Sequence, residues 1–269
     1  MRVISNLKEL HPDEAGNIAF VPTMGALHVG HAKLIARARE LSSHVLVSAF
    51  INPLQFNDPE DLEKYPRNSQ SDAVVAEESG ATILWRPEVE EIYPGDVELI
   101  SAGALGNLFE GVTRKGHFDG MLTVVNRLFT LVAPKWAIFG EKDFQQLFLV
   151  RQMVKEQGRE LKILSVPTVR DGDGLALSSR NVQLSEEERR AALVIYRALF
   201  RASKTLSLSE VRKELDKTLA EEPRFRCDYS AIIDEENFAL ATEETWSKRA
   251  LVAGWVGGLR LIDNMALRN

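Results

Sequence analysis

The chain has 269 residues, of which 45% are hydrophobic and 27% charged, an ordinary composition for a globular protein with one large or two moderate domains. Its formal net charge of −6 argues against a nucleic-acid binder, because such proteins usually carry a basic balance or a basic stripe. The sequence has no apolar run of about 18 residues for a membrane helix, no signal or transit peptide, and a lone Cys227 that excludes an intramolecular disulfide. We therefore expect a soluble cytoplasmic protein.

Short apolar runs alternate with helical patterns over the first two thirds of the chain. The runs that predict strands are residues 18–21, 45–51, 82–85, 136–139 and 162–166. The patterns that predict helices are residues 32–41, 71–79, 121–131 and 144–156. Because the expected strands are continuously apolar and are separated by helices, they predict a parallel sheet with helices on both faces. The expected fold class is α/β, with a Rossmann-like sheet.

The pattern of the sequence changes after about residue 175. Ser185 with Glu188, and Ser207 with Glu210, have the spacing of capping boxes, so each pair predicts the start of a helix. Strand-like pieces follow at residues 229–233, 250–253 and 259–262, with Gly254, Gly257 and Gly258 between the last two. The sequence therefore predicts a first domain of residues 1–174 and a smaller C-terminal α+β domain of residues 175–269.

The stretch FVPTMGALHVGH, residues 20–31, joins an expected strand to an expected helix. It has the glycine spacing of a Walker A loop, but His31 and Ala32 stand where that loop needs Lys and Ser/Thr. Zinc is disfavoured, because His28 and His31 lack the zincin spacing and a third soft ligand nearby. Two histidines that merely cap or line a helix start remain an alternative. A strand, a glycine turn and a helix also place backbone N–H groups at the sheet edge, where imidazoles can donate to phosphate oxygens.

The element His28-Val-Gly-His31 resembles the His-x-Gly-His signature of the nucleotidylyltransferase and class I aminoacyl-tRNA synthetase superfamily. The preceding PTMGALH is typical of the pantoate–β-alanine ligase family, and the resemblance continues to about Asn264. It implies an ATP-dependent condensation of pantoate with β-alanine through a pantoyl-adenylate, releasing AMP and pyrophosphate. His28 and His31 are then catalytic, with His31 as the proton donor. The ATP-binding residues implied in this stretch are Met24, Gly25, Ala26, Leu27, His28, Val29, Gly30 and His31.

Two further motifs hold candidate substrate contacts. Lys142 in FGEKDFQQL stands at an expected helix N-terminus, where the helix dipole disfavours a cation unless an anion is also present. A solvated lysine paired with a neighbouring carboxylate is the alternative. The resemblance makes Lys142 a catalytic phosphate contact and makes Gln55 in INPLQF and Gln146 the contacts to pantoate and β-alanine. The ATP-binding residues that it implies here are Gly140, Glu141, Lys142 and Asp143.

Two loops complete the resemblance. VRDGDGLALSSRN resembles the family's counterpart of the synthetase Lys-Met-Ser-Lys-Ser loop, and its mobile glycines and its Arg180 suit closure over a triphosphate, although an interdomain linker is an alternative. The ATP-binding residues implied in it are Val169, Leu177, Ser178, Ser179 and Arg180. TRKGHFDG resembles the family's gate loop, but Asp119 stands where the family frequently has arginine. We expect Lys115 to compensate for that exchange.

Such ATP chemistry also calls for Mg²⁺, which proteins hold with one or two carboxylates together with phosphates and water. Asp72 falls near an acidic pair of the family and is the implied metal ligand, although Ser71 occupies the other position. The resemblance further implies a homodimer whose C-terminal domain closes over the site, with small-molecule substrates as its partners and no nucleic acid or membrane. Two rival functions are another adenylyltransferase of the superfamily, which need not have Gln55 and Gln146, and a non-catalytic nucleotide-binding protein.

Overall fold

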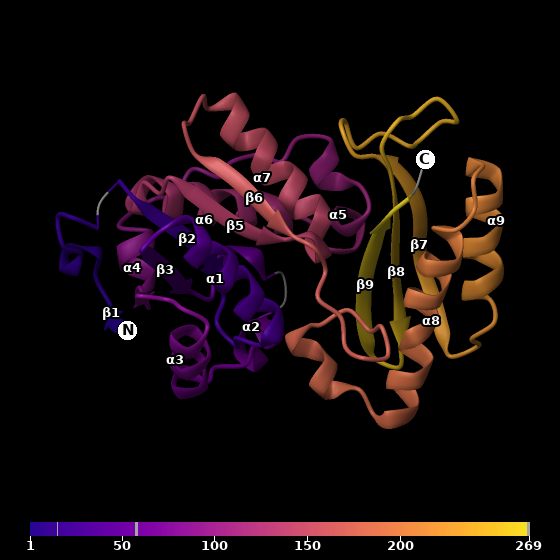
Figure 1. Ribbon diagram of the computed structural model, residues 1–269, viewed down its shortest axis with the longest axis horizontal. Helices are drawn as coiled ribbons and strands as arrows, with labels where there is room; N and C mark the ends of the chain where they lie inside the picture. The colour runs from indigo at the N-terminus through magenta and orange to yellow at the C-terminus, as the bar shows by residue number, and fades with distance from the viewer. Residues whose placement is uncertain (15, 57–58, 268–269) are drawn as a thin grey trace. The chain divides into compact units, whose positions relative to one another are not determined.

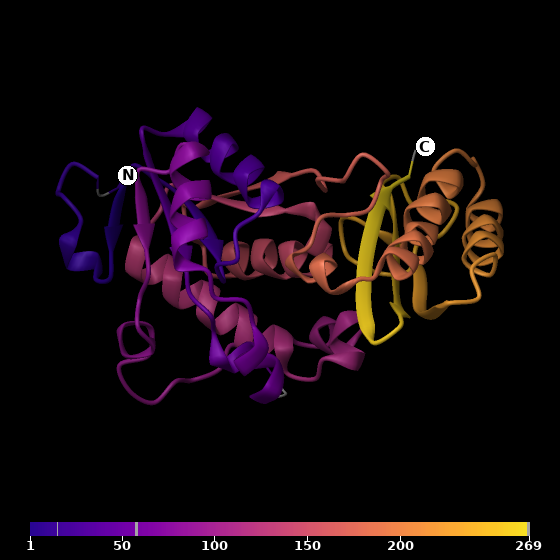
Figure 2. The same cartoon turned by 90° about the horizontal axis from the view of Figure 1, so that it is seen from below.

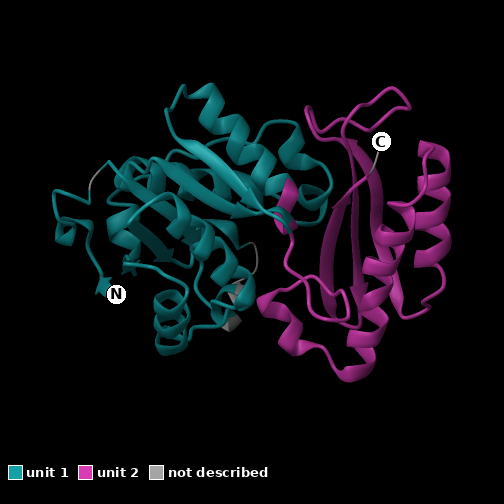
Figure 3. Ribbon diagram, in the orientation of Figure 1, with its two compact units in different colours: residues 1–141, 145–167 teal, residues 142–144, 168–269 magenta. Residues whose placement is uncertain are grey.

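The structure, a computed structural model, describes residues 1–14, 16–56 and 59–267 (Figure 1). The chain divides into two compact units, unit 1 with residues 1–141 and 145–167 and unit 2 with residues 142–144 and 168–269 (Figure 3). The division near the middle of the chain thus lies between residues 167 and 168, not between 174 and 175 as expected. Residues 142–144 and 168–174 join unit 2 because side chains of its C-terminal strands hold them, as described below.

Unit 1 contains a six-stranded parallel sheet with the order β1-β4-β3-β2-β5-β6, which confirms the α/β class. Its strands are β1 (Arg2–Ile4), β2 (Ile18–Thr23), β3 (His44–Ala49), β4 (Ile83–Trp85), β5 (Trp136–Gly140) and β6 (Lys162–Val166). The helices along this part of the chain are α1 (Val29–Leu41), α2 (Pro59–Lys64), α3 (Ser69–Glu78), α4 (Val89–Ile92), α5 (Glu110–Thr113), α6 (His117–Val132) and α7 (Phe144–Glu156). Short 3-10 turns are η1 (Leu7–Glu9), η2 (Pro53–Gln55), η3 (Leu105–Asn107) and η4 (Glu141–Asp143).

Helices cover both faces of this sheet, as the apolar strands predicted (Figure 2). Ala19 and Val21 of β2 belong to one apolar cluster with Ile35 of α1. Successive strand side chains point to opposite faces. Phe20 accordingly meets Phe129 of α6 on the other face, edge to face, with ring centroids 6.4 Å apart.

The order of the strands reverses at β2. From β2 the chain passes through α1 to β3 and β4 on one side, and it later reaches β5 and β6 on the other side. In the described chain the pairing of β2 with β5 stops at Phe20 and Ala137, although the strands continue to Thr23 and Gly140. Ligands of open parallel sheets bind at the carboxyl ends of strands where the order reverses. The turn after β2 and the end of β5 therefore share the edge expected to receive a ligand.

Unit 2 has an antiparallel sheet with the order β7-β8-β9, which confirms the smaller α+β part. Its elements are the 3-10 turn η5 (Ser179–Gln183), helices α8 (Glu186–Ala202) and α9 (Leu208–Leu219), and strands β7 (Phe225–Asp234), β8 (Lys248–Val256) and β9 (Leu259–Ala266). Both predicted capping boxes are present: the hydroxyls of Ser185 and Ser207 accept from the N–H groups of Glu188 and Glu210 at 3.3 and 3.2 Å. Within the described ranges, no helix combines the length and the apolar character needed to cross a membrane.

Some bounds differ from those expected, for physical reasons. Gly254 lies inside β8 rather than in the following turn. It is a glycine for packing rather than for a turn, because a Cβ there would be 2.2 Å from the ring of Phe225 on the neighbouring strand. The turn itself is at Gly257 and Gly258. Helix α1 begins at Val29 rather than at residue 32, because a histidine, which is not among the preferred N-cap residues, caps it.

Candidate functional site

The turn from β2 into α1 has a strained backbone that a buried carboxylate holds. Gly25 and Ala26 have φ angles of +82° and +50°, in the left-handed region that disfavours an alanine. Asp72 of α3 accepts the N–H of Ala26 at 3.1 Å with Oδ2 and the N–H of Leu27 at 2.6 Å with Oδ1. Thr23 accepts the N–H of Gly25 at 3.1 Å. Hydrogen bonds to a charged acceptor are strong, so Asp72 offsets the strain of this turn.

Asp72 therefore has a structural contact in addition to the metal-ligand role that the sequence implied, which stays a prediction. Its side chain is buried, at 4% exposure, and both carboxylate oxygens accept backbone N–H groups. Among the residues that the structure describes, no group of three or more His, Cys, Asp or Glu side chains is placed to hold a metal ion. These residues therefore do not fit a protein cage for Mg²⁺. They are compatible with an ion that phosphate oxygens and water hold.

His28 and His31 form a reciprocal cap at the start of α1. The N–H of Gly30 donates to Nδ1 of His28 at 3.0 Å, and the N–H of His28 donates to Nδ1 of His31 at 3.3 Å. The two ring centroids are 4.2 Å apart. Because each Nδ1 accepts a hydrogen bond, each neutral imidazole carries its proton on Nε2. The alternative of capping histidines is thus correct in geometry, and the same geometry fixes the tautomer that can donate through Nε2.

The glycine between the two histidines is required by their packing. A Cβ on Gly30 would lie 2.7 Å from Cε1 and 2.9 Å from Nδ1 of His28, well inside van der Waals contact. The first turn of α1 contains no acidic residue that would compete with an anion for its positive end. With its two imidazoles, its glycine and the positive end of its dipole, this helix start can bind a phosphate group.

Gln55 lies beside the same turn, within a buried polar network. Its Nε2 is 3.8 Å from Sδ of Met24, and its Oε1 accepts from Nδ2 of Asn52 at 3.2 Å. Asn52 is fully buried and also accepts from the hydroxyl of Tyr93 at 2.8 Å. Burial raises the pKa of Tyr93, so this phenol stays a neutral donor. His117 holds the backbone of Gln55, with Nδ1 3.1 Å from its carbonyl oxygen. The structure thus brings the predicted Gln55 next to the predicted Met24.

Gln146 and its neighbour Gln145 have different environments at the start of α7. Gln145 is buried, donates to the carbonyls of Leu105 and Leu108 at 2.9 Å each, and accepts the N–H of Glu110 at 3.2 Å. It therefore fixes the loop before α5. Gln146 is partly exposed and, among the described residues, has no hydrogen-bond partner. Of the two amides, Gln146 is the one that can still bind a substrate.

The gate-loop position Asp119 has a structural contact. Asp119 lies in the first turn of α6, where a negative charge is favourable, and its Oδ1 accepts the N–H of Ala102 at 2.7 Å. It therefore holds the loop of residues 100–103 against α6, a task unrelated to phosphate binding. Lys115 is exposed.

Lys142 lies in η4, directly after Gly140 and Glu141 at the end of β5. Its ammonium is 3.7 Å from Oδ1 of Asp143, whose side chain is 53% exposed, so this ion pair stabilises little. Glu141 accepts instead from the hydroxyl of Ser165 at 2.9 Å. The alternative of a lysine paired with a neighbouring carboxylate is therefore present, but as a weak contact that an anion can replace.

The loop of residues 169–181 is a structured hairpin within unit 2. The N–H of Leu177 donates to the carbonyl of Val169 at 2.9 Å, which closes the base of the loop. Ser178 caps η5 by accepting the N–H of Arg180 at 3.3 Å. The side chains of Ser179 and Arg180 are partly exposed, and the guanidinium of Arg180 makes no ion pair with a described residue. An unpaired arginine beside two hydroxyls suits an anionic ligand.

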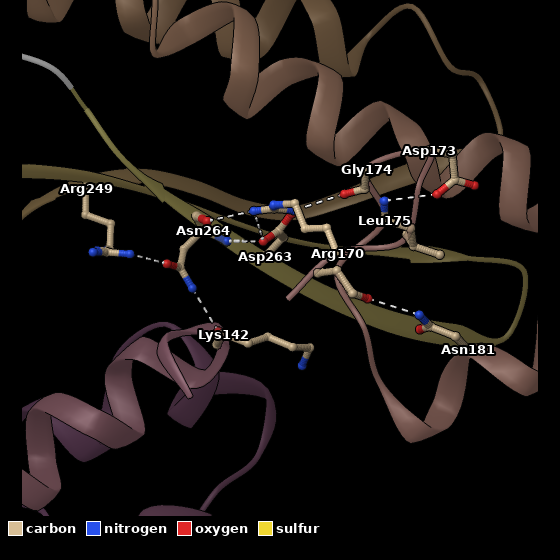
Figure 4. A network of polar contacts seen from close by, with 10 residues as sticks. Lys142, Arg170, Asp173, Gly174, Leu175, Asn181, Arg249, Asp263 and Asn264 are labelled. Carbon is tan, nitrogen blue, oxygen red and sulfur yellow. Dashed lines mark hydrogen bonds and ion pairs between the residues drawn. The ribbon is translucent and has the colours of Figure 1, made fainter. Parts of the chain in front are cut away.

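Sequence reasoning missed the residue that anchors this loop. Arg170 donates from both guanidinium ends to Asp263, at 2.6 and 2.9 Å (Figure 4). Burial raises the pKa of Asp263, and the arginine opposes this shift. Asp263 and Asn52 act on segments distant in the sequence, which a short motif does not reveal. His117 lies in the gate-loop motif, but that motif did not predict its contact with the carbonyl of Gln55. An acidic residue inside an apolar strand such as LRLIDN was the one available signal for Asp263.

Comparisons with known proteins extend over nearly the whole chain. A family model described as pantoate-beta-alanine ligase matches residues 1–266. The pantothenate synthetase of Thermus thermophilus is 46% identical over 274 residues, covering 98% of this chain and 99% of that protein. The pantothenate synthetase of Bacteroides fragilis is 42% identical and covers 98% of both chains.

Two solved structures of pantothenate synthetases also match nearly the whole chain. A crystal structure of pantothenate synthetase from Thermus thermophilus matches with a TM-score of 0.91 and 44% identity, over 98% of this chain and 99% of that one. The pantoate-beta-alanine ligase of Francisella tularensis, solved in complex with beta-gamma ATP and beta-alanine, matches with a TM-score of 0.80 and 35% identity, over 99% and 97% of the two chains.

Proposed function

This chain belongs to the pantoate–β-alanine ligase family, and from that membership we propose how its own residues carry out the reaction. The chain is an ATP-dependent ligase that joins pantoate to β-alanine to give pantothenate. A carboxylate is a poor electrophile, so the carboxylate of pantoate first attacks the α-phosphate of ATP. Pantoyl-adenylate forms and pyrophosphate leaves. The amine of β-alanine then attacks the acyl carbon, and AMP leaves.

The observation that supports this mechanism best is the reciprocal imidazole cap. Phosphoryl transfer depends on positioning and charge stabilisation rather than on a protein nucleophile. In the neutral form of His28 and His31 the proton is on Nε2, because each Nδ1 accepts a backbone N–H. Both Nε2–H groups then donate to phosphate oxygens as negative charge grows, and His31 is the proton donor. The residues from Met24 to His31 bind ATP, with the N-terminus of α1 facing its phosphates.

Unit 2 also carries proposed ATP contacts. Lys142 supplies a mobile positive charge to the phosphates, and its weak pair with Asp143 gives way to them. Arg180, Ser178 and Ser179 bind the leaving pyrophosphate. Val169 and Leu177 contact ATP beside them. The loops of residues 110–120 and 176–181 keep water from the mixed anhydride.

Gln55 and Gln146 bind the two acceptor substrates. An amide offers two donors and an acceptor, which suits the hydroxyls and the carboxylate of pantoate. Gln55 is positioned by Asn52 and by the backbone contact of His117, so its amide is preorganised next to Met24. Gln55 binds pantoate near the β-alanine position. Gln146, for which the described chain offers no hydrogen-bond partner, is available for pantoate.

The metal, the role of Lys115, the oligomeric state and the location are further proposals. Mg²⁺ accompanies the phosphates of ATP, with Asp72 as its candidate carboxylate ligand and phosphate oxygens and water completing its shell. Lys115 takes over the triphosphate contact for which Asp119, engaged with Ala102, is unsuited. The enzyme works as a cytoplasmic homodimer, which light scattering would check against the 30.1 kDa of one chain.

Pyrophosphate release tests the proposed function. The protein is incubated with ATP and pantoate, with and without β-alanine, and pantoate is omitted in a control. We expect pyrophosphate whenever pantoate is present, sustained turnover when β-alanine is added, and none without pantoate. A protein that releases no pyrophosphate with pantoate would instead be an adenylyltransferase with another acceptor or a non-catalytic nucleotide binder.

A further inference from the structure

Two adjacent residues of β9 contact two segments that the proposed function uses for ATP. Asp263 and Asn264 are both buried, at 5% and 4% exposure. Asp263 accepts both ends of the Arg170 guanidinium, and Asn264 donates from Nδ2 to the carbonyl of Lys142 at 2.8 Å. Successive side chains of a strand point to opposite faces, so the two residues reach these segments from opposite sides of β9. Figure 4 shows Arg170 beside Asp263, and Lys142 beside Asn264.

The turn that carries Lys142 is fixed on both sides. Arg249 donates to Oδ1 of Asn264 at 2.7 Å, so both ends of this amide are engaged and its orientation is determined. The same guanidinium lies 4.0 Å from the ring centroid of Phe144. Phe144 also stacks against Phe238, with centroids 6.0 Å apart. These contacts explain why residues 142–144 belong to unit 2 while the chain on either side belongs to unit 1.

The base of the serine loop is fixed from the other face. Besides its two bonds to Asp263, Arg170 donates to the carbonyl of Gly174 at 3.1 Å and to the carbonyl of Asn264 at 3.3 Å. Its guanidinium lies 4.9 Å from the ring centroid of Tyr196 on α8. Gly174 cannot be another residue, because its φ is +100° and a Cβ would lie 2.1 Å from that ring. The hairpin that carries Ser178 to Arg180 therefore starts from a rigid base.

We propose that Asp263 and Asn264 are positioning residues for ATP use, which hold the Lys142 turn and the base of the 169–181 loop at a fixed separation within unit 2. Neither residue touches the substrate. Asn264 acts through Lys142, and Asp263 acts through Arg170. The inference rests on the proposed function, in which both segments contact the phosphates.

The variant Asn264→Asp isolates the contact with Lys142. It replaces the Nδ2 donor by an oxygen of the same size, keeps an acceptor for Arg249, and sets two oxygens against each other where the bond was 2.8 Å. Loss of one buried hydrogen bond with misplacement of the lysine should lower kcat/KM for ATP about 10-fold or more, with KM for pantoate unchanged. Asn264→Ala, which adds no charge, should change the same quantities by less. If thermal unfolding shows that Asn264→Asp does not fold, Asn264→Ala replaces it in these kinetic measurements.

A matched control lies in the same sheet. Asp228→Asn weakens the ion pair with Arg260 at 2.7 Å, which joins β7 to β9, and should leave kcat/KM for ATP at the wild-type value. The decisive measurement is a double-mutant cycle with Lys142→Ala. If Asn264 acts through Lys142, the double variant is no slower than Lys142→Ala alone. The positioning role would be overturned if the losses in kcat/KM of the two single variants add in the double variant. It would also be overturned if Asn264→Asp keeps the wild-type kcat/KM, as Asp228→Asn does. Either result would leave the wild-type activity and the Lys142 contact with phosphate unaffected. A Lys142→Ala variant with normal activity would instead overturn the phosphate contact itself, and this inference with it.

Discussion

Replacing Gly30 by alanine perturbs one imidazole without removing any side chain of the candidate site. The new Cβ would lie 2.7 Å from Cε1 of His28, whereas carbon atoms in contact are normally about 3.5–4.0 Å apart. The ring must therefore move by about 1 Å. This movement disrupts the bond from Gly30 N–H to Nδ1, now 3.0 Å, and displaces the proton on Nε2.

The magnitudes separate an effect on activity from an effect on stability. Gly30 has no positive φ, so alanine stabilises the helix by up to about 1 kcal/mol relative to glycine. Loss of the histidine cap costs about 1 kcal/mol in the opposite direction. The free energy of unfolding should therefore change by less than about 1 kcal/mol. A misplacement of about 1 Å in a reacting group, in contrast, lowers the rate about 100-fold.

The assay is pyrophosphate release with pantoate and subsaturating ATP, compared with urea unfolding of the same preparation. Gly95→Ala is the matched control, because a Cβ at that glycine meets no atom within 4 Å. We expect kcat/KM for Gly30→Ala to fall about 100-fold, while the control stays at the wild-type value. A Gly30→Ala variant that folds and reacts at the wild-type rate would show that the position of the His28 ring is irrelevant to the chemistry.

Three further predictions follow from individual contacts. His31→Ala and Lys142→Ala should each slow adenylate formation by about 10²–10³ fold, the scale for removing one charge-stabilising donor, and an unaltered rate of pyrophosphate release in either would place the phosphates elsewhere. Asp72→Asn turns one acceptor of the β2–α1 turn into a donor that faces an N–H, so urea unfolding should report a loss of about 2 kcal/mol. An unchanged stability would contradict the anchor, and rescue of activity by extra Mg²⁺ would support Asp72 as the metal ligand. Burial raises the pKa of Asp173, but hydrogen bonds from a backbone N–H and an arginine outweigh it and hold that pKa below its ordinary 3.8. A carboxyl with a depressed folded pKa stabilises above its unfolded pKa and loses this contribution as the pH falls through the folded value. The stability difference between wild type and Asp173→Asn should thus shrink below pH 3.8 in urea titrations, and a constant difference from pH 7 to pH 2 would contradict the assignment.

Local patterns predicted the regular elements well. Helix α7 (Phe144–Glu156) and strand β6 (Lys162–Val166) lie at the predicted residues. A helical pattern that ends before Gly158 marks the first, and a short apolar run marks the second. The capping boxes at Ser185 and Ser207 located α8 and α9 for the same reason: a cap is a contact between residues three apart. Short edge strand β1 (Arg2–Ile4) was missed, because three residues are too few to show a period.

The sequence alone did not predict contacts between residues that are far apart in the chain. The bond from Leu27 to Asp72 joins residues 45 apart, and the bond from Asn264 to Lys142 joins residues 122 apart. A motif identifies which side chains can act on phosphate. It does not reveal which buried groups hold those side chains in place, because burial depends on the folded chain. The sequence also did not reveal that Asp72 anchors the β2–α1 turn, since a carboxylate that accepts backbone N–H groups looks the same in a sequence as one that binds a cation. Its role as a metal ligand stays a prediction.

The most direct test of the proposed site is a crystal structure of this protein with pantoate and a non-hydrolysable ATP analogue. We predict that phosphate oxygens lie within hydrogen-bond distance, about 2.7–3.2 Å, of Nε2 of His28, Nε2 of His31 and Nζ of Lys142. A polyphosphate bound elsewhere, or imidazoles whose Nδ1 rather than Nε2 faces it, would contradict the account.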